Sequence, residues 1–567
     1  MNFIKLLILT VLIYFTIPDI QAQTWNQIGQ KILGDTIGNR TGSEVSMPDP
    51  NTMAIASTYA QTNDTVTGQV RVYRLKNNVW VQKGIDLIGP MKSTEGNSIS
   101  MPDSNTIAIG NTYVAGVGDY NQPAGQVQVR YWDGNKWKQK GQTIFGEKRG
   151  TFLGEAVSMP DPNTLAIGNS RHRERSRSGG SFESGCVKIY SYNKQADTWV
   201  QKGNRIIGDT SDYSKTDKMG NSVSMPDSNT IAIGAFTSEV NGQYSGAVRV
   251  YNYRNGNWVK KGSDFIGITG DYLGSDVKMP DANTLAFSVP RGNNDSGYVD
   301  VYRWKNNQWE LKGRISNINL SRWISVTVDM PDTNTIAVGI PISNNGGEVR
   351  IYNWNNTWIQ QGNTIIEKIG GRIGASISMP NSKNIITGAP LSNLNGQFSG
   401  VIRTFTFCDS SAIDVSITNN SPTLTANLSN ATYQWLNCDS SYAVIPGETN
   451  QSFTASFNGN YAVEVSQGVC VDTSACVSVS VNNILEHAFK NQLSLYPNPT
   501  DGKLALKLDE TYSTVTLSVN NIIGQTVLNK NYHSVDALEF DIVGKPGIYF
   551  IKVIANNKTA VFKIIKQ

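Results

Sequence analysis

The chain has 567 residues and is rich in residues typical of strands and turns, including 52 glycines, 23 tyrosines and 12 tryptophans. Its length exceeds what one hydrophobic core organises, so we expect several domains. Only 17% of the residues are charged and the formal net charge is +4, so composition gives no reason to expect a nucleic-acid partner or a strongly anionic one.

The N-terminus is typical of a signal peptide over residues 1–22. Lys5 provides the charged flank, Leu6 to Ile17 is an apolar run, and cleavage is expected between Ala22 and Gln23. The run is short for a bilayer span, and no later stretch approaches about 20 apolar residues. We therefore expect an exported chain without a transmembrane segment after cleavage. The alternative is an uncleaved membrane anchor.

Two landmarks repeat seven times between residues 23 and 407, which predicts one structural unit per repeat. Met-Pro-Asp, with Asn in the last copy, begins at Met47, Met101, Met159, Met225, Met279, Met330 and Met379. Trp-x-x-x-Gly begins at Trp25, Trp80, Trp137, Trp199, Trp258, Trp309 and Trp358. The methionines are 49 to 66 residues apart, which suits a four-stranded propeller blade.

One repeat shows the four predicted strands. They are 220–226, 230–234, 246–251 and the strand of Trp258, with an Asn255-Gly256 hairpin turn before the last. The chain opens with a last strand, Trp25 to Gly29, whereas the seventh repeat ends at Phe405 without one. We therefore predict an all-β protein with a seven-bladed β-propeller over 23–407, closed by its N-terminal strand.

The repeat resembles the FG-GAP repeat of integrin-α-type propellers. The matching residues are Gly220-x-Ser-Val-Ser, Asp227, Ile231 to Ala235 and Gly246-x-Val-x-Val-Tyr. Many members of that family bind Ca²⁺ in an acidic loop after the first strand. Here the corresponding turn is only Asp-x-Asn, too short to supply six or more oxygens. The resemblance implies the fold, and we expect no metal or other cofactor.

Catalytic groups are hard to find in this sequence. His172, His487 and His533 lie far apart without metal-ligand spacing, and Cys186 is interpreted as a buried bystander. The repeated Asp of Met-Pro-Asp has two interpretations: a ring of metal ligands, or the first residue of a tight turn that accepts a backbone N–H, which we favour. Acids from distant blades could still converge on the propeller axis, as in a polysaccharide-degrading enzyme.

Ligand binding is predicted on one face of the propeller. The repeated tryptophans could stack on sugars, but their equivalent positions favour packing between blades. The loops between second and third strands vary in length, and recognition is usually placed in such loops. The run from Arg171 to Arg177 could hold an anionic polysaccharide or be a solvated loop. The candidate residues on this face are Tyr113, Arg171, Arg173, Arg175 and Tyr244.

Residues 408–482 differ from the repeats. Tyr433-Gln434-Trp435-Leu436 and the later 459–465 segment resemble two strands of an Ig-like sandwich. Four of the five cysteines lie here, as in a disulfide-stapled domain, and three pairings are open: the candidates are Cys408, Cys438, Cys470 and Cys476. Residues 483–490 are predicted to be a linker.

Residues 491–567 carry the most specific resemblance. The segments 495–502, 521–525 and 546–553 are similar, in order and spacing, to the type A C-terminal sorting domain of the type IX secretion system. The matching residues are Pro497, Asn498, Pro499, Gly502, Gly524, Gly547, Tyr549 and Lys552. From the residues alone we expect a second small sandwich, with prolines that block strand pairing at its start.

Together, these predictions indicate a function for the protein. The sorting resemblance implies the type IX machinery as a partner and a secreted or outer-cell-surface location. We predict an adhesin-like binding protein that takes an extracellular glycan or protein on the variable loop face. The alternative is a polysaccharide hydrolase or lyase with acidic residues on the propeller face, which a cluster of non-repeating acids at one channel mouth would favour.

Overall fold

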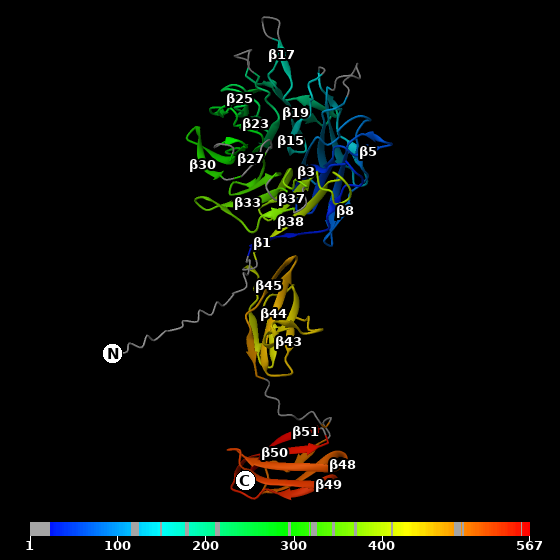
Figure 1. Cartoon of the computed structure of the whole chain (residues 1–567), viewed down its shortest axis with the longest axis vertical. Coiled ribbons are helices and arrows are strands. Elements are labelled where there is room, and N and C mark those ends of the chain that lie inside the picture. Colours follow the sequence, from blue (N-terminus) through cyan, green and yellow to red (C-terminus); the bar gives the residue numbers. More distant parts are fainter. Residues whose placement is uncertain are drawn as a thin grey trace, which may run out of the picture. The chain divides into compact units, whose positions relative to one another are not determined.

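The computed structural model describes residues 23–114, 124–147, 150–175, 181–209, 216–292, 296–316, 318, 326–342, 346–367, 371–409, 412–480, 489, 493–556 and 558–567 (Figure 1). The strands of the described residues make the protein all-β, and a short 3-10 turn at Cys438–Ser440 lies among them. It divides into two compact units, Met1–Ala412 with Gly468–Cys470, and Ile413–Gln467 with Val471–Gln567. The predicted signal peptide and most of the predicted linker lie outside the described residues.

In its described residues the first unit contains seven antiparallel sheets of four or five strands, besides two two-stranded hairpins; the seven are numbered here in chain order by their four main strands. Sheets 1 to 3 are β3 (Thr41–Asp49), β4 (Thr52–Ser57), β7 (Gln69–Lys76) and β8 (Val79–Gln82); β10 (Ser98–Asp103), β11 (Thr106–Asn111), β12 (Gln126–Trp132) and β13 (Trp137–Gln139); and β15 (Ala156–Asp161), β16 (Thr164–Asn169), β19 (Cys186–Asn193) and β20 (Thr198–Gln201). Sheet 4 is β22 (Ser222–Asp227), β23 (Thr230–Ala235), β24 (Ala247–Arg254) and β25 (Asn257–Lys260).

Sheets 5 to 7 repeat the order. They are β27 (Val277–Asp281), β28 (Thr284–Val289), β29 (Tyr298–Lys305) and β30 (Gln308–Ser316); β31 (Thr327–Asp332), β32 (Thr335–Ile340), β33 (Glu348–Trp354) and β34 (Trp358–Gln360); and β36 (Ser376–Asn381), β37 (Asn384–Ala389), β38 (Val401–Asp409) and β1 (Gln23–Gln27). In Figure 1 the labelled strands β3, β15, β27 and β37 lie nearer the middle of this unit than β8, β25 and β30.

The N-terminal strand is part of the seventh sheet. β1 pairs antiparallel with β38, and Trp25 lies opposite Phe407 in the register. The first strands of successive sheets are neighbours throughout, and β36 of sheet 7 lies beside β3 of sheet 1. The two ends of the repeat region are therefore joined in one sheet, which leaves no unpaired first or last repeat.

A ring of hydrogen bonds joins the first strands. The methionine N–H of one sheet donates to the serine Oγ of the preceding sheet, each at 3.0 Å: Met47 to Ser378, Met101 to Ser46, Met159 to Ser100, Met225 to Ser158 and Met279 to Ser224. These N–H groups lie on free strand edges, where they need a partner. The hydroxyls therefore hold neighbouring sheets in register.

The repeated tryptophans pack between sheets, as predicted. The ring of Trp137, for example, lies against Gly84 of the preceding sheet, and its Nε1 donates to the Lys83 carbonyl oxygen at 2.8 Å. A Cβ on Gly84 would approach the Trp132 and Trp137 rings to 2.7 and 2.9 Å. The glycine of Trp-x-x-x-Gly is therefore required because the next tryptophan occupies the space of a side chain.

The repeated aspartates form turns. In the first repeat, Oδ1 of Asp49 accepts from the Asn51 N–H at 2.8 Å, and the equivalent bond is present in all seven repeats, with Asn381 in the last. The turn asparagine also accepts from a lysine of the preceding sheet in five repeats, as Asn105 does from Lys83 Nζ at 2.7 Å. The turn interpretation of these aspartates is thus confirmed, and this end of the unit is uniform.

The second unit begins with two facing sheets. One contains β39 (Ile417–Asn420), β40 (Thr423–Ala426) and β43 (Ser452–Thr454). The other contains β42 (Ala443–Val444), β41 (Thr432–Asn437), β44 (Gly459–Gln467), β45 (Cys470–Thr473) and β46 (Val477–Val479). Fully buried Trp435 of the second sheet stacks on Phe453 of the first, with ring centroids 5.3 Å apart.

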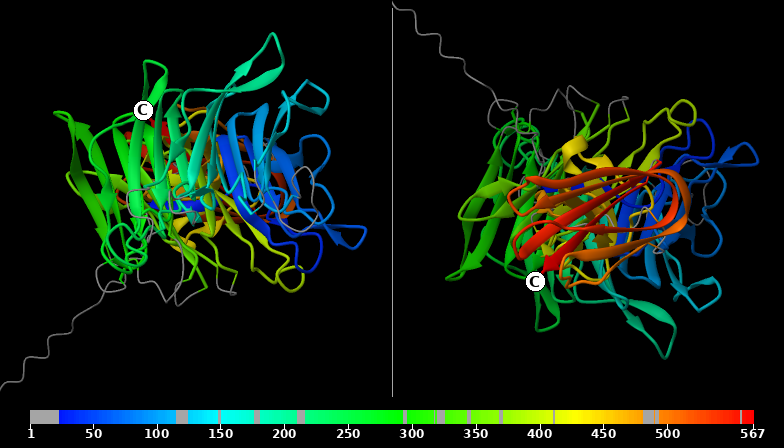
Figure 2. Two further views of the ribbon diagram at one scale, coloured as in Figure 1. Left: turned by 90° about the horizontal axis from the view of Figure 1, so that it is seen from above. Right: turned by 90° about the horizontal axis from the view of Figure 1, so that it is seen from below.

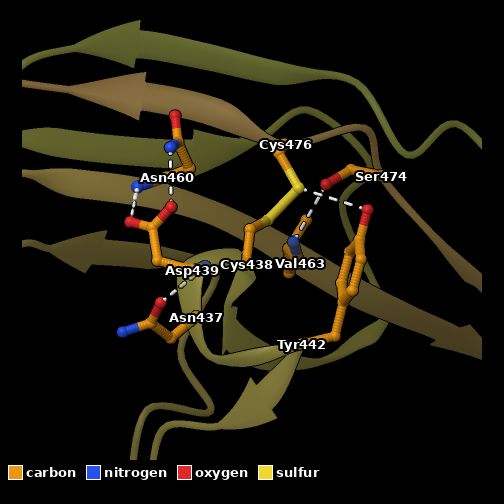
Figure 3. The surroundings of a disulfide bond; sticks show 8 residues. All are labelled: Asn437, Cys438, Asp439, Tyr442, Asn460, Val463, Ser474 and Cys476. Atoms are coloured by element: carbon orange, nitrogen blue, oxygen red, sulfur yellow. Dashed lines mark hydrogen bonds between the residues drawn. A yellow bond between two sulfur atoms is a disulfide. The ribbon is translucent and has the colours of Figure 1, made fainter.

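The four clustered cysteines form two disulfides, Cys408–Cys470 and Cys438–Cys476, which selects one of the three open pairings. Figure 3 shows the second, beside Tyr442, whose hydroxyl lies 3.2 Å from Cys476 Sγ. Next to it, Asp439 accepts from the backbone and side-chain N–H groups of Asn460, at 2.8 and 2.7 Å. The disulfide therefore lies within a polar network that fastens the β41–β42 connection to β44.

The last sheet of the second unit contains β47 (Ser494–Tyr496), β48 (Lys503–Asn521), β50 (Gly547–Ala555) and β51 (Lys558–Lys566), with β49 (Thr526–Asp541) paired to β48. β48 shifts register against β49 between Lys507 and Tyr512. Its first half also pairs with β47 and its second half with β50. Buried side chains from these strands form a separate core that includes Tyr512, Leu517 and Ile551. Across the described residues, no helix is long and apolar enough to cross a membrane.

Candidate ligand-binding face and sorting domain

The antiparallel order of each sheet gives the first unit two different ends. Turns between first and second strands, and between third and fourth, fall at the uniform end of the Asp-x-Asn turns. Loops between second and third strands, and between sheets, fall at the opposite end, which we call the loop face. The β17 (Arg173–Arg175) and β18 (Ser181–Glu183) hairpin projects from the loop face (Figures 1 and 2).

Five residues at one repeated position of the loop face have a left-handed backbone. Each lies seven residues before the methionine of a first strand: Arg40, Phe152, Lys218, Tyr272 and Arg372, with φ angles of +54°, +56°, +50°, +56° and +59°. Arg40, Phe152 and Tyr272 belong to the clusters described below. The left-handed region is uncommon for residues other than glycine, especially bulky ones. Because it recurs at an equivalent position, the repeat sets the direction of these side chains.

The first cluster on the loop face contains Tyr113, Phe152 and Arg171. The Tyr113 and Phe152 rings meet edge to face with centroids 5.4 Å apart, and Arg171 Cζ lies 4.3 Å from the Phe152 centroid. Tyr113 is 51% exposed, and Arg171 is exposed too. Two of the predicted ligand residues thus come together, through a phenylalanine that sequence reasoning did not select.

The second cluster contains Tyr244, Tyr272 and Arg291. The Tyr244 and Tyr272 rings are stacked 5.1 Å apart with an interplanar angle of 10°, and Arg291 Cζ lies 5.2 Å from the Tyr272 centroid. The Tyr272 N–H donates to the Tyr244 carbonyl oxygen at 3.0 Å. The predicted residue Tyr244 therefore belongs to a site of the same composition as the first cluster, between sheets 4 and 5.

The third cluster contains Phe398, Arg40 and Tyr59, between sheets 7 and 1. Arg40 Cζ lies 4.2 Å from the Tyr59 centroid, and the Arg40 N–H donates to the Phe398 carbonyl oxygen at 3.0 Å. Tyr59 and Phe398 are 42% and 38% exposed. An alignment of the repeats on their methionines would have found this cluster, because Arg40, Phe152 and Tyr272 share one column.

The other predicted arginines differ. Arg173 pairs with Glu183 across the β17–β18 hairpin at 3.1 Å, so its charge is partly used within the protein. Arg175 lies at the end of β17, and its side chain is outside the described part of the structure. Only Arg171 of the three arginines is therefore placed in an aromatic cluster.

A second group of polar side chains interrupts the ring of serines. Lys278 and Asp329 occupy the serine position in sheets 5 and 6, and Lys278 Nζ lies 2.8 Å from Asp329 Oδ1. Asp329 also accepts from the Met330 and Met379 N–H groups, at 3.0 and 2.6 Å. Nearby, Asp276 accepts from the Val328 N–H at 2.8 Å. Asp276 directly precedes β27, and Asp329 lies on β31.

Two carboxyl groups of this inner region have raised pKa values. Burial, followed by the charge of Asp276, raises the pKa of Glu44 to about 8. Burial likewise raises the pKa of Asp276 to about 7, against the opposing effect of its backbone hydrogen bond from Val328. Among the described residues, however, no three His, Cys, Asp or Glu side chains are arranged to hold a metal ion.

The sorting-type residues fasten the first segment of the last domain to its last strand. Asn498 Nδ2 donates to the Lys563 carbonyl oxygen at 3.0 Å, and its Oδ1 accepts from the Ile565 N–H at 2.9 Å. Pro497 and Pro499 lack N–H groups, so the Asn498 side chain supplies bonds that a backbone would otherwise make. Thr500 continues with a backbone bond to Ile565.

The remaining residues of that motif have separate positions. Gly502 has φ of +124° and its carbonyl oxygen accepts from the Ile542 N–H at 2.8 Å, while Gly524 closes the β48–β49 turn by donating to the Asn521 carbonyl oxygen. Gly547 begins β50. The Tyr549 hydroxyl donates to the Lys545 carbonyl oxygen at 2.8 Å, and Lys552 is exposed on β50. In the described structure, these motif residues thus mainly contact other residues of the same domain.

Comparison with known families assigns this domain. Residues 494–567 match the secretion system C-terminal sorting domain. This domain marks proteins that the type IX secretion system delivers to the cell surface or the extracellular space, and the chain is therefore such an exported protein. The match begins three residues after the predicted boundary at 491.

Other comparisons add less. No curated protein matches the chain. Among solved structures, a protein from Lactobacillus plantarum is similar, with a TM-score of 0.38 and 11% sequence identity, over 75% of this chain and 99% of that protein.

Proposed function

We propose that the seven sheets are the blades of a seven-bladed β-propeller of FG-GAP type over residues 23–407. The closed order of first strands and the β1–β38 pairing support it. We also propose an Ig-like domain over 408–482, because Trp435 packs between two sheets and the Tyr461 hydroxyl donates to the Phe457 carbonyl oxygen at 3.0 Å. Such a tyrosine corner is typical of Ig-like sandwiches.

We propose that the protein is an adhesin-like binding protein whose loop face holds an extracellular ligand. The observation that carries this proposal is the gathering of half-exposed aromatic rings with arginines on the loop face. At the other end, the lysines that lie over aromatic rings belong to the repeated tryptophan and turn positions. Exposed aromatic side chains with a polar end are enriched at binding surfaces. A rigid sheet scaffold with variable loops suits such recognition.

A loop-replacement experiment tests this proposal. Residues 237–244 of the β23–β24 loop are replaced by Asn-Gly in the full secreted chain, which removes Tyr244 from its cluster. Binding is measured on an array of polysaccharides and immobilised extracellular proteins, with reducing-sugar release followed in parallel. We expect the variant to lose binding while its thermal unfolding stays close to that of the intact chain. Unchanged binding would reject the loop face, and sugar release would favour an enzyme.

A further inference from the structure

We infer that the ligand of the loop face is a polysaccharide carrying carboxylate or sulfate groups, held by the three arginine–aromatic clusters. This inference rests on the proposed function and specifies its ligand class. The clusters lie at the junctions of sheets 2 and 3, 4 and 5, and 7 and 1.

The three clusters keep one composition although their residues change places. Each has one arginine and two aromatic residues. In the left-handed position the residue is aromatic in two clusters and Arg40 in the third. Two residues after the second strand of that same sheet, the residue is arginine in two clusters and Tyr59 in the third. A shared binding chemistry would keep this composition while the arginine and the aromatic residue exchange places.

The cationic groups of two clusters are not used by acidic partners. In the described structure, neither Arg40 nor Arg171 forms an ion pair with a carboxylate. Two carboxylates on the loop side pair with other arginines: Asp217 with buried Arg249 at 2.8 Å, and Asp86 with Arg71 at 3.2 Å. The guanidinium groups of Arg40 and Arg171 instead lie over aromatic rings, which leaves their N–H edges able to receive an anion.

Guanidinium and tyrosine together suit an acidic sugar. A guanidinium group binds carboxylate or sulfate oxygens through two parallel charge-assisted hydrogen bonds. An exposed aromatic ring offers an apolar face of about the size of a pyranose ring, and its hydroxyl can bond to sugar oxygens. A neutral glycan offers the arginines no charged partner, so the pairing of both groups favours a uronic-acid or sulfated polymer.

Repetition of the clusters favours a polymer over a protein ligand. A protein interface concentrates its affinity in a few central residues that fill pockets. Here equivalent small sites recur around one face, and a chain of repeating units can occupy several of them. Each additional site then raises affinity through effective concentration, without a new kind of contact. We therefore expect strong length dependence.

The experiment uses the full secreted chain, with polygalacturonate and chondroitin sulfate as acidic probes and laminarin as a neutral probe. Binding is measured by biolayer interferometry at two salt concentrations. We expect tight, salt-sensitive binding to an acidic probe and at least tenfold weaker binding to laminarin. Arg171→Gln and Tyr113→Ala should each lower affinity for the acidic probe about tenfold, the loss of roughly one charge-assisted or stacking contact. Arg40→Gln with Arg171→Gln should lose more than either alone.

Matched controls lie at the uniform end. Arg254→Gln removes an exposed arginine there and Tyr131→Ala an aromatic ring that is 37% exposed, so neither should change affinity. Thermal unfolding shows whether each variant is folded. Equal binding of laminarin, or no effect of Arg171→Gln and Arg40→Gln, would overturn the inference. Capture of a protein ligand through the β23–β24 loop would also overturn it, while leaving the proposed function standing.

Discussion

Lys278 Nζ lies 2.8 Å from Asp329 Oδ1, at the one junction of the described first strands where a lysine stands in the place of the accepting serine. A lysine ammonium group cannot accept a hydrogen bond, so the Met330 N–H turns to Asp329 of its own sheet. The ion pair therefore replaces the serine-to-methionine bond between sheets 5 and 6. Lys278 and Asp329 link these two sheets only when both are present.

The contributions of Lys278 and Asp329 to the free energy of unfolding should be coupled. Asp329→Ala removes the acceptor of two backbone N–H groups and leaves Lys278 without its partner, so we expect a loss of about 3 kcal/mol. The double variant Lys278→Ser with Asp329→Ser restores the hydroxyl pattern of the other repeats. We expect it to be more stable than Asp329→Ala, as measured by chemical unfolding. Additive effects of Lys278→Ser and Asp329→Ser in a double-mutant cycle would contradict the coupling.

The free energy of unfolding of the first unit should fall as the pH rises from about 4 to about 8. The pKa of Glu44 is raised to about 8 and that of Asp276 to about 7, mainly by burial. Between the unfolded and folded pKa values the folded state binds more protons, so deprotonation favours unfolding in that window. Glu44→Gln should flatten the dependence of melting temperature on pH. Asp64→Asn, at an exposed loop position, should leave the dependence as it is.

The contact between tryptophan and glycine can be isolated with two glycines of the same φ. Gly84 and Gly256 both have φ of +82°, but a Cβ at Gly84 would meet the Trp132 and Trp137 rings, whereas a Cβ at Gly256 would meet no atom within 4 Å. Gly256→Ala should cost about 1–2 kcal/mol from backbone strain alone. Gly84→Ala should cost about 2 kcal/mol more because the tryptophans must move. Equal losses in chemical unfolding would argue against tryptophan packing as the reason for this glycine.

The Cys438–Cys476 disulfide should stabilise its domain through the unfolded state. It links positions 38 residues apart, and for such a loop the chain-entropy relation gives about 4 kcal/mol. Cys438→Ser with Cys476→Ser should lower the free energy of unfolding of this domain by that amount, as measured by chemical unfolding. Tyr442→Phe, which removes only the hydroxyl beside Cys476 (Figure 3), should cost less than about 1 kcal/mol.

Export should depend on the last domain. A chain that ends at residue 493 lacks the matched sorting domain but keeps both disulfides and all seven sheets. We expect it to accumulate in the periplasm, as seen by cell fractionation and immunoblotting. Delivery of this truncated chain to the cell surface at the level of the intact protein would contradict the assignment.

Local patterns in the sequence were sufficient for much of the fold. The alternation around Val248 and Val250, the Asn255-Gly256 turn and the Asp-x-Asn turns each depend on neighbours along the chain, and the strands and turns formed where these patterns indicated. The missing strand after Phe405 and the extra strand at Trp25 likewise predicted the β1–β38 pairing, because unpaired edges need partners.

The sequence by itself determined the strands, their repeat, the closing pair and the sorting domain, because each is written in short stretches of chain with a fixed spacing. Tertiary structure alone decided the disulfide pairing and the meeting of Phe152 with Tyr113 and Arg171. These contacts join residues of different repeats or distant segments. Their partners depend on how sheets pack and on a left-handed backbone position, neither of which a local pattern specifies.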